Sequence, residues 1–262
     1  MVRNVRVGDF TIASHEQGVG DPVLLVHSGG FSSRQWKRLV ALLAPTHHVL
    51  APDLLGYGES SPWPADRPFH FSRDLDALAA VLAGLPPAHV VGHSYGGFLA
   101  LMLALRDPPA VRSLALYDPV AFGILDEPAD AEARAALYLP APTYTGVPWL
   151  AAFVDWWNGP GAWQHLAPEA QAAFVAAGPK LYGEVMSLTA DTTDRAGYAK
   201  ISQPTLLFGG ERTTTTEHRV VEKLGRTLPN VEVHWVEGAG HMGPITHGAI
   251  VNAAIAAHIR AH

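Results

Sequence analysis

The sequence contains no cysteine. Disulfide bonds, thiolate metal sites and a cysteine nucleophile are therefore excluded. Charge is also sparse, because only 16% of the residues are charged and the net charge is −6. No cluster of lysine and arginine occurs anywhere in the chain. We therefore expect no nucleic-acid partner, since phosphate backbones are bound by basic surfaces.

Long apolar runs are missing as well. No segment reaches the roughly 18 consecutive apolar residues that a membrane-spanning helix needs. The charged first residues, 1–7, are not followed by the apolar stretch of a signal peptide. The 21 prolines are scattered and form no proline-rich tract. These absences favour an ordered cytoplasmic protein that does not bind membranes. We expect a monomer or a homodimer, although the sequence does not determine the oligomeric state.

Short apolar runs alternate with amphipathic segments along most of the chain. Val5, Val7, Phe10 and Ile12 alternate around Gly8, which predicts an N-terminal hairpin. Apolar runs typical of buried parallel strands occur at 22–26, 48–51, 89–91, 111–117, 205–208 and 231–236. Helical patterns lie between them at about 34–43, 72–84, 96–106, 217–228 and 247–260. The alternation predicts an α/β fold with a mostly parallel sheet between helices.

The alternation stops once, between the sixth strand and the next. Proline and glycine divide this stretch, which predicts short helices, and we interpret residues 121–200 as a helical cap inserted into a core of 1–120 and 201–262. The cap carries aromatic residues at helical spacing, namely Trp149, Phe153, Trp156 and Trp157. Such a stripe either buries one helix face in the protein core or lines an apolar substrate pocket.

A G-x-S-x-G pattern occupies residues 92–96, directly after an apolar run and directly before a helical one. A serine in such a strand-turn-helix context has unfavourable backbone angles, and the flanking glycines leave room for the turn that exposes its hydroxyl. Ser94 is therefore the candidate nucleophile, although an ordinary glycine-rich turn is the alternative. His93 points away from the nucleophile by alternation and is interpreted as structural.

A serine nucleophile needs a base on another loop. Of the 14 histidines, His241 follows the last expected strand within a glycine-containing loop, G-A-G-H-M-G-P. Such a loop lets an imidazole reach across the carboxyl edge of the sheet. We therefore take His241 as the candidate general base, with Met242 beside it as a candidate pocket residue.

With these residues in place, the chain resembles the α/β-hydrolase family, and specifically its esterase-like serine hydrolases, over nearly its whole length. Four motifs in the family's order carry the resemblance, at 24–30 (LLVHSGG), 52–60 (PDLLGYGES), 92–97 (GHSYGG) and 238–241 (GAGH). The resemblance implies an oxyanion hole of two backbone N–H groups, those of Tyr95 and Gly29, with Gly30 as the alternative donor and as a candidate pocket residue. It implies a loop-ordering role for Asp53. We expect no cofactor, and no metal because no cluster of histidine and carboxylate residues has ligand spacing in the sequence. The family commonly has glycine and then a bulky residue after this histidine, whereas Ser28 and Gly29 occupy those places here.

The triad carboxylate departs from the family's pattern. Where the resemblance implies G-x-x-D after the seventh strand, residues 210–213 read G-E-R-T. Asp118 follows the sixth strand, where some relatives carry the acid, at the sheet edge that holds Ser94 and His241. An aspartate that merely begins a turn before Pro119 is the alternative reading. Glu211 and Glu217 remain open as acids, although Thr214 and Glu217 also have the spacing of a helix capping box.

The function expected from these residues is hydrolysis of a carboxylic ester of a small, largely apolar substrate through an acyl-enzyme. Cleavage of a C–C bond beside a ketone, or of a lactone, would use the same triad. The C–C reaction predicts cap groups that bind a carboxylate, and Arg134 and Arg195 are candidates. A receptor that keeps the pocket without turnover is a further alternative from a different class.

Overall fold

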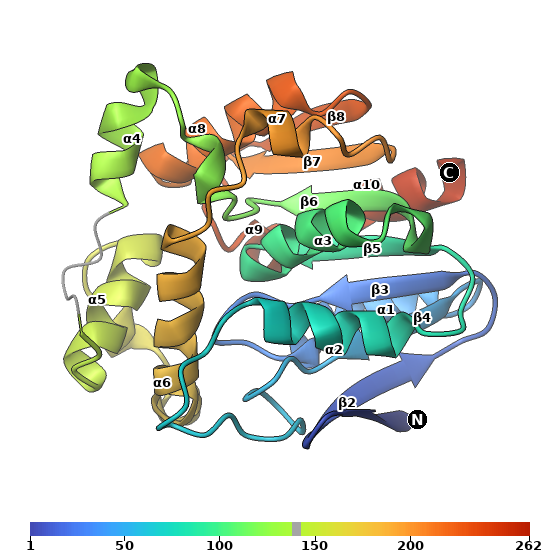
Figure 1. The fold of residues 1–262 in the computed structure, drawn as a ribbon, viewed down its shortest axis with the longest axis horizontal. Helices are drawn as coiled ribbons and strands as arrows, with labels where there is room; N and C mark the ends of the chain where they lie inside the picture. The colour runs from blue at the N-terminus through green and yellow to red at the C-terminus, as the bar shows by residue number, and fades with distance from the viewer. Residues whose placement is uncertain (138–142) are drawn as a thin grey trace.

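An eight-stranded sheet forms the centre of the molecule (Figure 1). The computed structural model describes residues 1–137 and 143–262. Its strands are β1 (Val2–Val7), β2 (Phe10–Gln17), β3 (Pro22–Val26), β4 (His48–Pro52), β5 (Ala88–His93), β6 (Val111–Tyr117), β7 (Thr205–Gly210) and β8 (Val231–Val236). Their order across the sheet is β1-β2-β4-β3-β5-β6-β7-β8, in which only the β1–β2 and β2–β4 pairs are antiparallel. The prediction of a mostly parallel sheet with an N-terminal hairpin is confirmed.

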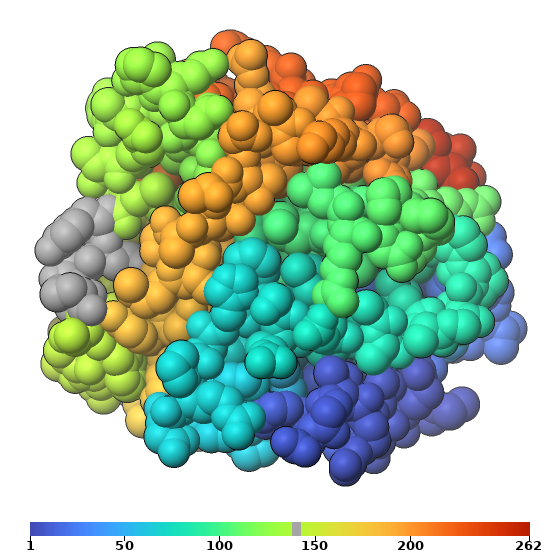
Figure 2. Space-filling view, in the orientation of Figure 1, coloured from blue at the N-terminus to red at the C-terminus, as the bar shows by residue number. Residues whose placement is uncertain are grey.

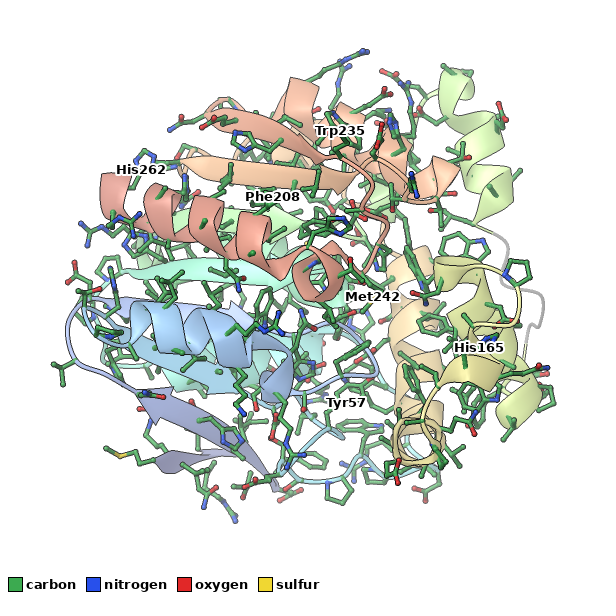
Figure 3. The ribbon with its side chains drawn as sticks, turned by 180° about the vertical axis from the view of Figure 1, so that it is seen from behind. Tyr57, His165, Phe208, Trp235, Met242 and His262 are labelled. Atoms are coloured by element: carbon green, nitrogen blue, oxygen red, sulfur yellow. The ribbon has the colours of Figure 1, made fainter. Side chains whose placement is uncertain are left out.

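Alternate residues of each inner strand divide between two apolar cores. Leu24 and Val26 of β3 belong to the core beneath α2, α3 and α8, whereas Val23 and Leu25 belong to the core beneath α1 and α10. The two helix layers are visible from the front in Figure 1 and from behind in Figure 3. These helices are α1 (Lys37–Leu43), α2 (Ser72–Leu82), α3 (Tyr95–Arg106), α8 (Thr215–Thr227) and α10 (Gly248–Ala261), with the short α9 (Gly243–Thr246) before α10. No helix in the described ranges is both long and apolar enough to cross a bilayer.

Helices fill the described chain between β6 and β7. They are α4 (Ala131–Ala136), α5 (Val147–Asn158), α6 (Pro168–Thr189) and α7 (Arg195–Tyr198). Helices α4, α5 and α6 lie beyond the carboxyl ends of the strands, at the left in Figure 1. In Figure 2 the amber α6 lies against the cyan segment that precedes α2, and Gly183 of α6 packs directly on Phe69 of that segment.

The longest cap helix differs from the expectation of short segments. Helix α6 runs for 22 residues through Gly178 and Pro179. A proline inside a helix removes one backbone hydrogen bond and costs about 3 kcal/mol or more. The carbonyl that loses its donor belongs to Val175, an exposed residue. Buried contacts of Lys180 and Glu184, described below, hold the helix together beyond the proline.

Candidate active site

Ser94 occupies the turn between β5 and α3. Its backbone has φ 55° and ψ −119°, a strained conformation for a residue with a side chain. Glycine is required on either side of Ser94 because the turn leaves no space for a side chain there. A Cβ on Gly92 would lie 2.3 Å from the carbonyl oxygen of Gly96, and a Cβ on Gly96 would lie 2.3 Å from that of Val26. The G-x-S-x-G pattern therefore reflects the space that this turn leaves.

Three side chains from three separate loops meet at this turn. Nε2 of His241 lies 2.9 Å from Oγ of Ser94, and Nδ1 of His241 lies 3.2 Å from Oδ2 of Asp118. All three residues are buried. Because a carboxylate can only accept, Nδ1 of His241 carries the proton and Nε2 is left to accept from the serine hydroxyl.

Asp118 begins the loop after β6 and, like Ser94, has a positive φ, of 40°. The hydroxyl of Thr213 donates to its Oδ2 at 2.7 Å, and the backbone N–H of Gly210 donates to its Oδ1 at 3.1 Å. Burial is the largest influence on the pKa of Asp118 and raises it, whereas these two donors oppose the rise. Thr213, which stands where the family pattern has its acid, thus hydrogen-bonds the carboxylate that contacts His241.

The two glutamates considered as alternative acids lie elsewhere. The carboxylate of Glu211 accepts from the backbone N–H of Gly238 at 2.7 Å, at the beginning of the His241 loop. Glu217 donates its backbone N–H to the hydroxyl of Thr214, which caps the helix, but neither oxygen of its carboxyl has a hydrogen-bond partner among the described residues, so only half of the expected capping box forms. Its carboxyl is fully buried, and burial followed by the charge of Asp118 raises its pKa well above the ordinary value. Of the three candidates, only Asp118 contacts His241.

His241 is enclosed by aromatic rings. The indole of Trp157, from α5, stacks on its imidazole with ring centres 3.7 Å apart and planes inclined by 19°. The ring of His93 lies 5.1 Å away, centre to centre. Burial lowers the pKa of His241 to about 3, so the imidazole is neutral near neutral pH.

A chain of hydrogen bonds joins the His241 loop to the loop after β3. Nε2 of His93 donates to the carbonyl of His241 at 2.7 Å, and Nδ1 of His93 accepts from the amide of Gln35 at 3.1 Å. The amide oxygen of Gln35 in turn accepts from the backbone N–H of Ser28 at 3.0 Å. His93 is therefore a positioning residue, in keeping with its structural interpretation.

In the loop after β3, two of three successive backbone N–H groups already have hydrogen-bond partners. The N–H of Ser28 is taken by Gln35, and the N–H of Gly30 hydrogen-bonds the hydroxyl of Tyr57. Gly29, between them, lines the same cavity as Ser94 and Tyr95. The N–H of Tyr95 is the first of α3, and N–H groups of a first turn have no partner inside their helix. These contacts favour Gly29 over Gly30 as the partner of Tyr95.

An apolar cavity of about 370 Å³ opens above Ser94, between the sheet and the cap. Four of the expected pocket residues line it, namely Phe153, Trp156, Trp157 and Met242. Figure 3 shows Met242 at the end of the sheet that faces the cap, with His165 of the lining on the cap side. The expected Trp149 and Gly30 are not in the lining. Trp149 is buried inside the cap, where it stacks on Phe153, and Gly30 lies beneath the ring of Phe174.

A buried ionic cluster at the junction of cap and core escaped the sequence analysis. Nζ of Lys180 contacts the carboxylates of Asp74, at 2.8 Å, and Glu184. The hydroxyls of Tyr57 and Tyr95 donate to Glu184 and Asp74, each at 2.9 Å. The spacing of Leu181, Glu184, Val185 and Leu188 is a signal that could have revealed it, because it places one carboxylate within an apolar helix face.

Asp53 orders its loop as expected. Its carboxylate accepts from the backbone N–H groups of Ser33 at 2.7 Å and Glu59 at 2.9 Å, and it contacts His15 at 3.1 Å. These partners lie on β2 and in the loops after β3 and β4, and Ser94 is not among them. Asp53 therefore holds loops that support the site.

Comparison with known proteins decides the family. A model of the alpha/beta hydrolase family matches residues 23–254. The chain belongs to this family. The alpha/beta hydrolase is 28% identical, over 94% of its own length and 89% of the relative's, to 2-hydroxymuconate semialdehyde hydrolase of Pseudomonas putida. It is 29% identical, over 92% of its length and 95% of the relative's, to the pimeloyl-[acyl-carrier protein] methyl ester esterase of Chromobacterium violaceum. The crystal structure of a hydrolase from Pseudomonas aeruginosa PA01 matches its fold with a TM-score of 0.80, at 23% identity and 98% coverage of both chains.

Proposed function

We propose that this hydrolase cleaves carboxylic esters of small, largely apolar substrates through an acyl-enzyme on Ser94. One observation carries the proposal: the serine hydroxyl lies 2.9 Å from an imidazole whose other nitrogen faces the buried carboxylate of Asp118, and this array opens into an apolar cavity. A nucleophile, a base and an orienting acid in this arrangement are the requirements of acyl transfer.

In this mechanism Ser94 Oγ attacks the ester carbonyl while Nε2 of His241 takes its proton. The imidazolium that forms is stabilised by Asp118, and the N–H groups of Tyr95 and Gly29 hold the developing oxyanion. His241 then returns the proton to the leaving alcohol as the C–O bond breaks. Water, deprotonated by the same imidazole, attacks the acyl-enzyme and releases the acid, which restores Ser94.

An ester is favoured over an amide because an alkoxide leaving group needs less protonation than an amine. The cavity volume of about 370 Å³ is near the lower end of ligand pockets, which favours a small substrate. Its largest lining side chains are aromatic and aliphatic. These features support an apolar acyl or alkyl group as the part of the substrate that is buried.

Cleavage of a C–C bond beside a ketone is the second candidate. The similarity to 2-hydroxymuconate semialdehyde hydrolase supports it. The carboxylate-binding arginines that were candidates for this reaction are outside the described cavity lining: Arg195 pairs with Glu127 at the surface, and Arg134 is exposed on α4. We therefore place ester hydrolysis first.

The test combines active-site labelling with turnover. The parent protein is treated briefly with a neutral alkyl fluorophosphonate, its intact mass is measured, and hydrolysis of methyl butyrate is followed in parallel. We expect one adduct and measurable turnover for the parent, and neither for Ser94→Ala. Ser72→Ala, on α2 and outside the cavity lining, is the matched control and should behave as the parent.

Each other outcome would contradict part of the proposal. An adduct that persists in Ser94→Ala would place the nucleophile elsewhere. A labelled parent that cleaves a vinylogous 1,5-diketone acid but no ester would favour the C–C reaction. A parent that neither reacts nor turns over, but binds apolar esters reversibly, would point to a receptor.

A further inference from the structure

The cavity face of α6 is largely apolar and carries one charged side chain. Leu181, Glu184, Val185 and Leu188 all line the cavity, at the i, i+3, i+4 and i+7 spacing of one helix face. Glu184 is the one carboxylate in the described lining, which contains no lysine or arginine. A charged group within an otherwise apolar binding wall commonly fixes the orientation or the chemistry of a ligand.

The cluster that holds Glu184 has more carboxylates than cations. Lys180 is the single ammonium between Glu184 and Asp74, and the tyrosines that complete the cluster, Tyr57 and Tyr95, contribute neutral hydroxyls. All five residues are buried. With both carboxylates ionised the cluster therefore carries one uncompensated negative charge beside the cavity, and burial of such a charge is unfavourable unless a partner is supplied.

Glu184 lies next to the backbone that is proposed to bind the oxyanion. A Cβ placed on Gly29 would be 2.8 Å from Oε2 of Glu184. The family commonly has a bulky side chain at this position, whereas this chain has glycine and fills the space with a carboxylate from the cap. Because Gly29 also lines the cavity, the carboxylate is close to the place where the ester carbonyl would sit.

We propose that Glu184 selects substrates by charge: it favours esters that carry a hydrogen-bond donor, a hydroxyl or an ammonium, close to the carbonyl, and it disfavours esters that carry a carboxylate there. The inference rests on the proposed ester hydrolysis and names its substrate class. A hydroxyl or ammonium on the substrate would donate a hydrogen bond to the Glu184 carboxylate. A substrate carboxylate would instead bring a second negative charge next to it in a poorly solvated site.

The ionisation of Glu184 gives the selection a pH dependence. Burial raises the pKa of Glu184 to about 7, the charge of Asp74 acts in the same direction, and Lys180 and the hydroxyl of Tyr57 oppose the rise. The carboxylate is thus charged at pH 8.5 and largely protonated at pH 5.5. Discrimination between cationic and anionic esters should therefore be greater at the higher pH.

The test compares four methyl esters with the same carbon chain: butyrate, 3-hydroxybutyrate, 3-aminobutyrate and the monoester of succinate. Turnover is measured at pH 8.5 by chromatographic determination of methanol. For the parent we expect kcat/KM for the hydroxy and amino esters to exceed that for the succinate by about tenfold or more. In Glu184→Gln, which leaves Lys180 and Asp74 as a neutral pair, this ratio should fall to within about threefold of one.

The matched control is Glu169→Gln, the same change at an exposed position of α6, which should keep the parent's ratio. A purely structural role of Glu184 would lower turnover of all four esters equally and would overturn the inference. A parent that hydrolyses butyrate without any preference among the charged esters would also overturn it, while leaving ester hydrolysis intact.

A second measurement is independent of ester turnover. Fluorophosphonates with short tails that end in an ammonium or a carboxylate are compared by their rates of adduct formation on Ser94. The parent should react faster with the cationic reagent and Glu184→Gln should not. Equal rates on the parent would refute charge selection even if none of the four esters proved to be a substrate. Failure to hydrolyse any of the four esters is a separate outcome, which would count against the proposed ester hydrolysis.

Discussion

Removal of the Thr213 hydroxyl tests whether its hydrogen bond to Asp118 supports catalysis. Thr213→Val keeps the shape of the side chain but deletes the donor that lies 2.7 Å from Oδ2 of Asp118, and Gly210 and His241 remain as its partners. A hydrogen bond to a charged group contributes about 1.5–3 kcal/mol. If the carboxylate supports the imidazolium in the transition state, kcat/KM should fall by about 10- to 150-fold.

The pH profile separates this effect from general damage. Because the Thr213 hydrogen bond lowers the pKa of Asp118, its loss should move the acidic limb of kcat/KM for methyl butyrate to higher pH. Thr213→Ser keeps a hydroxyl and should stay within about threefold of the parent. If Thr213→Val were as active as Thr213→Ser and had the parent's pH profile, the hydroxyl would have no part in holding the acid.

Three further outcomes are expected. Asp118→Asn should lower turnover by about three to four orders of magnitude, since the imidazole loses the partner that fixes its tautomer; a loss of only a few-fold would move the acid elsewhere. Trp157→Leu should lower kcat/KM by about 10- to 30-fold, because the indole stacks on His241 and a desolvated cation–π contact contributes up to about 2 kcal/mol; unchanged kinetics in a folded variant would reduce Trp157 to a packing residue. Burial raises the pKa of Glu184 to about 7, so the native state binds more protons than the unfolded chain between about pH 4.5 and pH 7. As the pH rises through that window, the contribution of this residue to the free energy of unfolding should decrease by about 3 kcal/mol. Urea unfolding of parent and Glu184→Gln at several pH values would show the difference, and parallel curves would contradict it.

The sheet could be predicted from the sequence because its signals are local. Strands buried on both faces are continuous apolar runs, so β3 (Pro22–Val26) and β7 (Thr205–Gly210) stand out between helical patterns. The turn at Ser94 was equally visible, since the steric demand of its backbone leaves glycine as the only residue that fits at 92 and 96. In both cases a few neighbouring residues determine the structure.

Features that depend on contacts distant in the sequence were out of reach. The spacing of Trp149 and Trp157 puts both on one apolar stripe, yet Trp149 turns into the cap core while Trp157 reaches His241. Proline and glycine were expected to divide the cap into short helices, and nothing near Pro179 in the sequence shows that Lys180 beyond it is held by Asp74, 106 residues earlier. At position 213 the sequence shows only that the aspartate of the family pattern is absent, because the partner of Thr213, Asp118, follows a different strand.

The hydrogen bonds through Gln35 and His93 connect two loops that are far apart in the sequence. Ser28 fixes the backbone beside the proposed oxyanion donor and His241 is the proposed base, and the two are linked through only two intervening side chains. We therefore expect the two loops to move together, so that the distance between base and oxyanion donor varies less than the position of either loop. The alignment of a transition state would then depend on the hydrogen bonds of Gln35 and His93 as well as on the reacting groups.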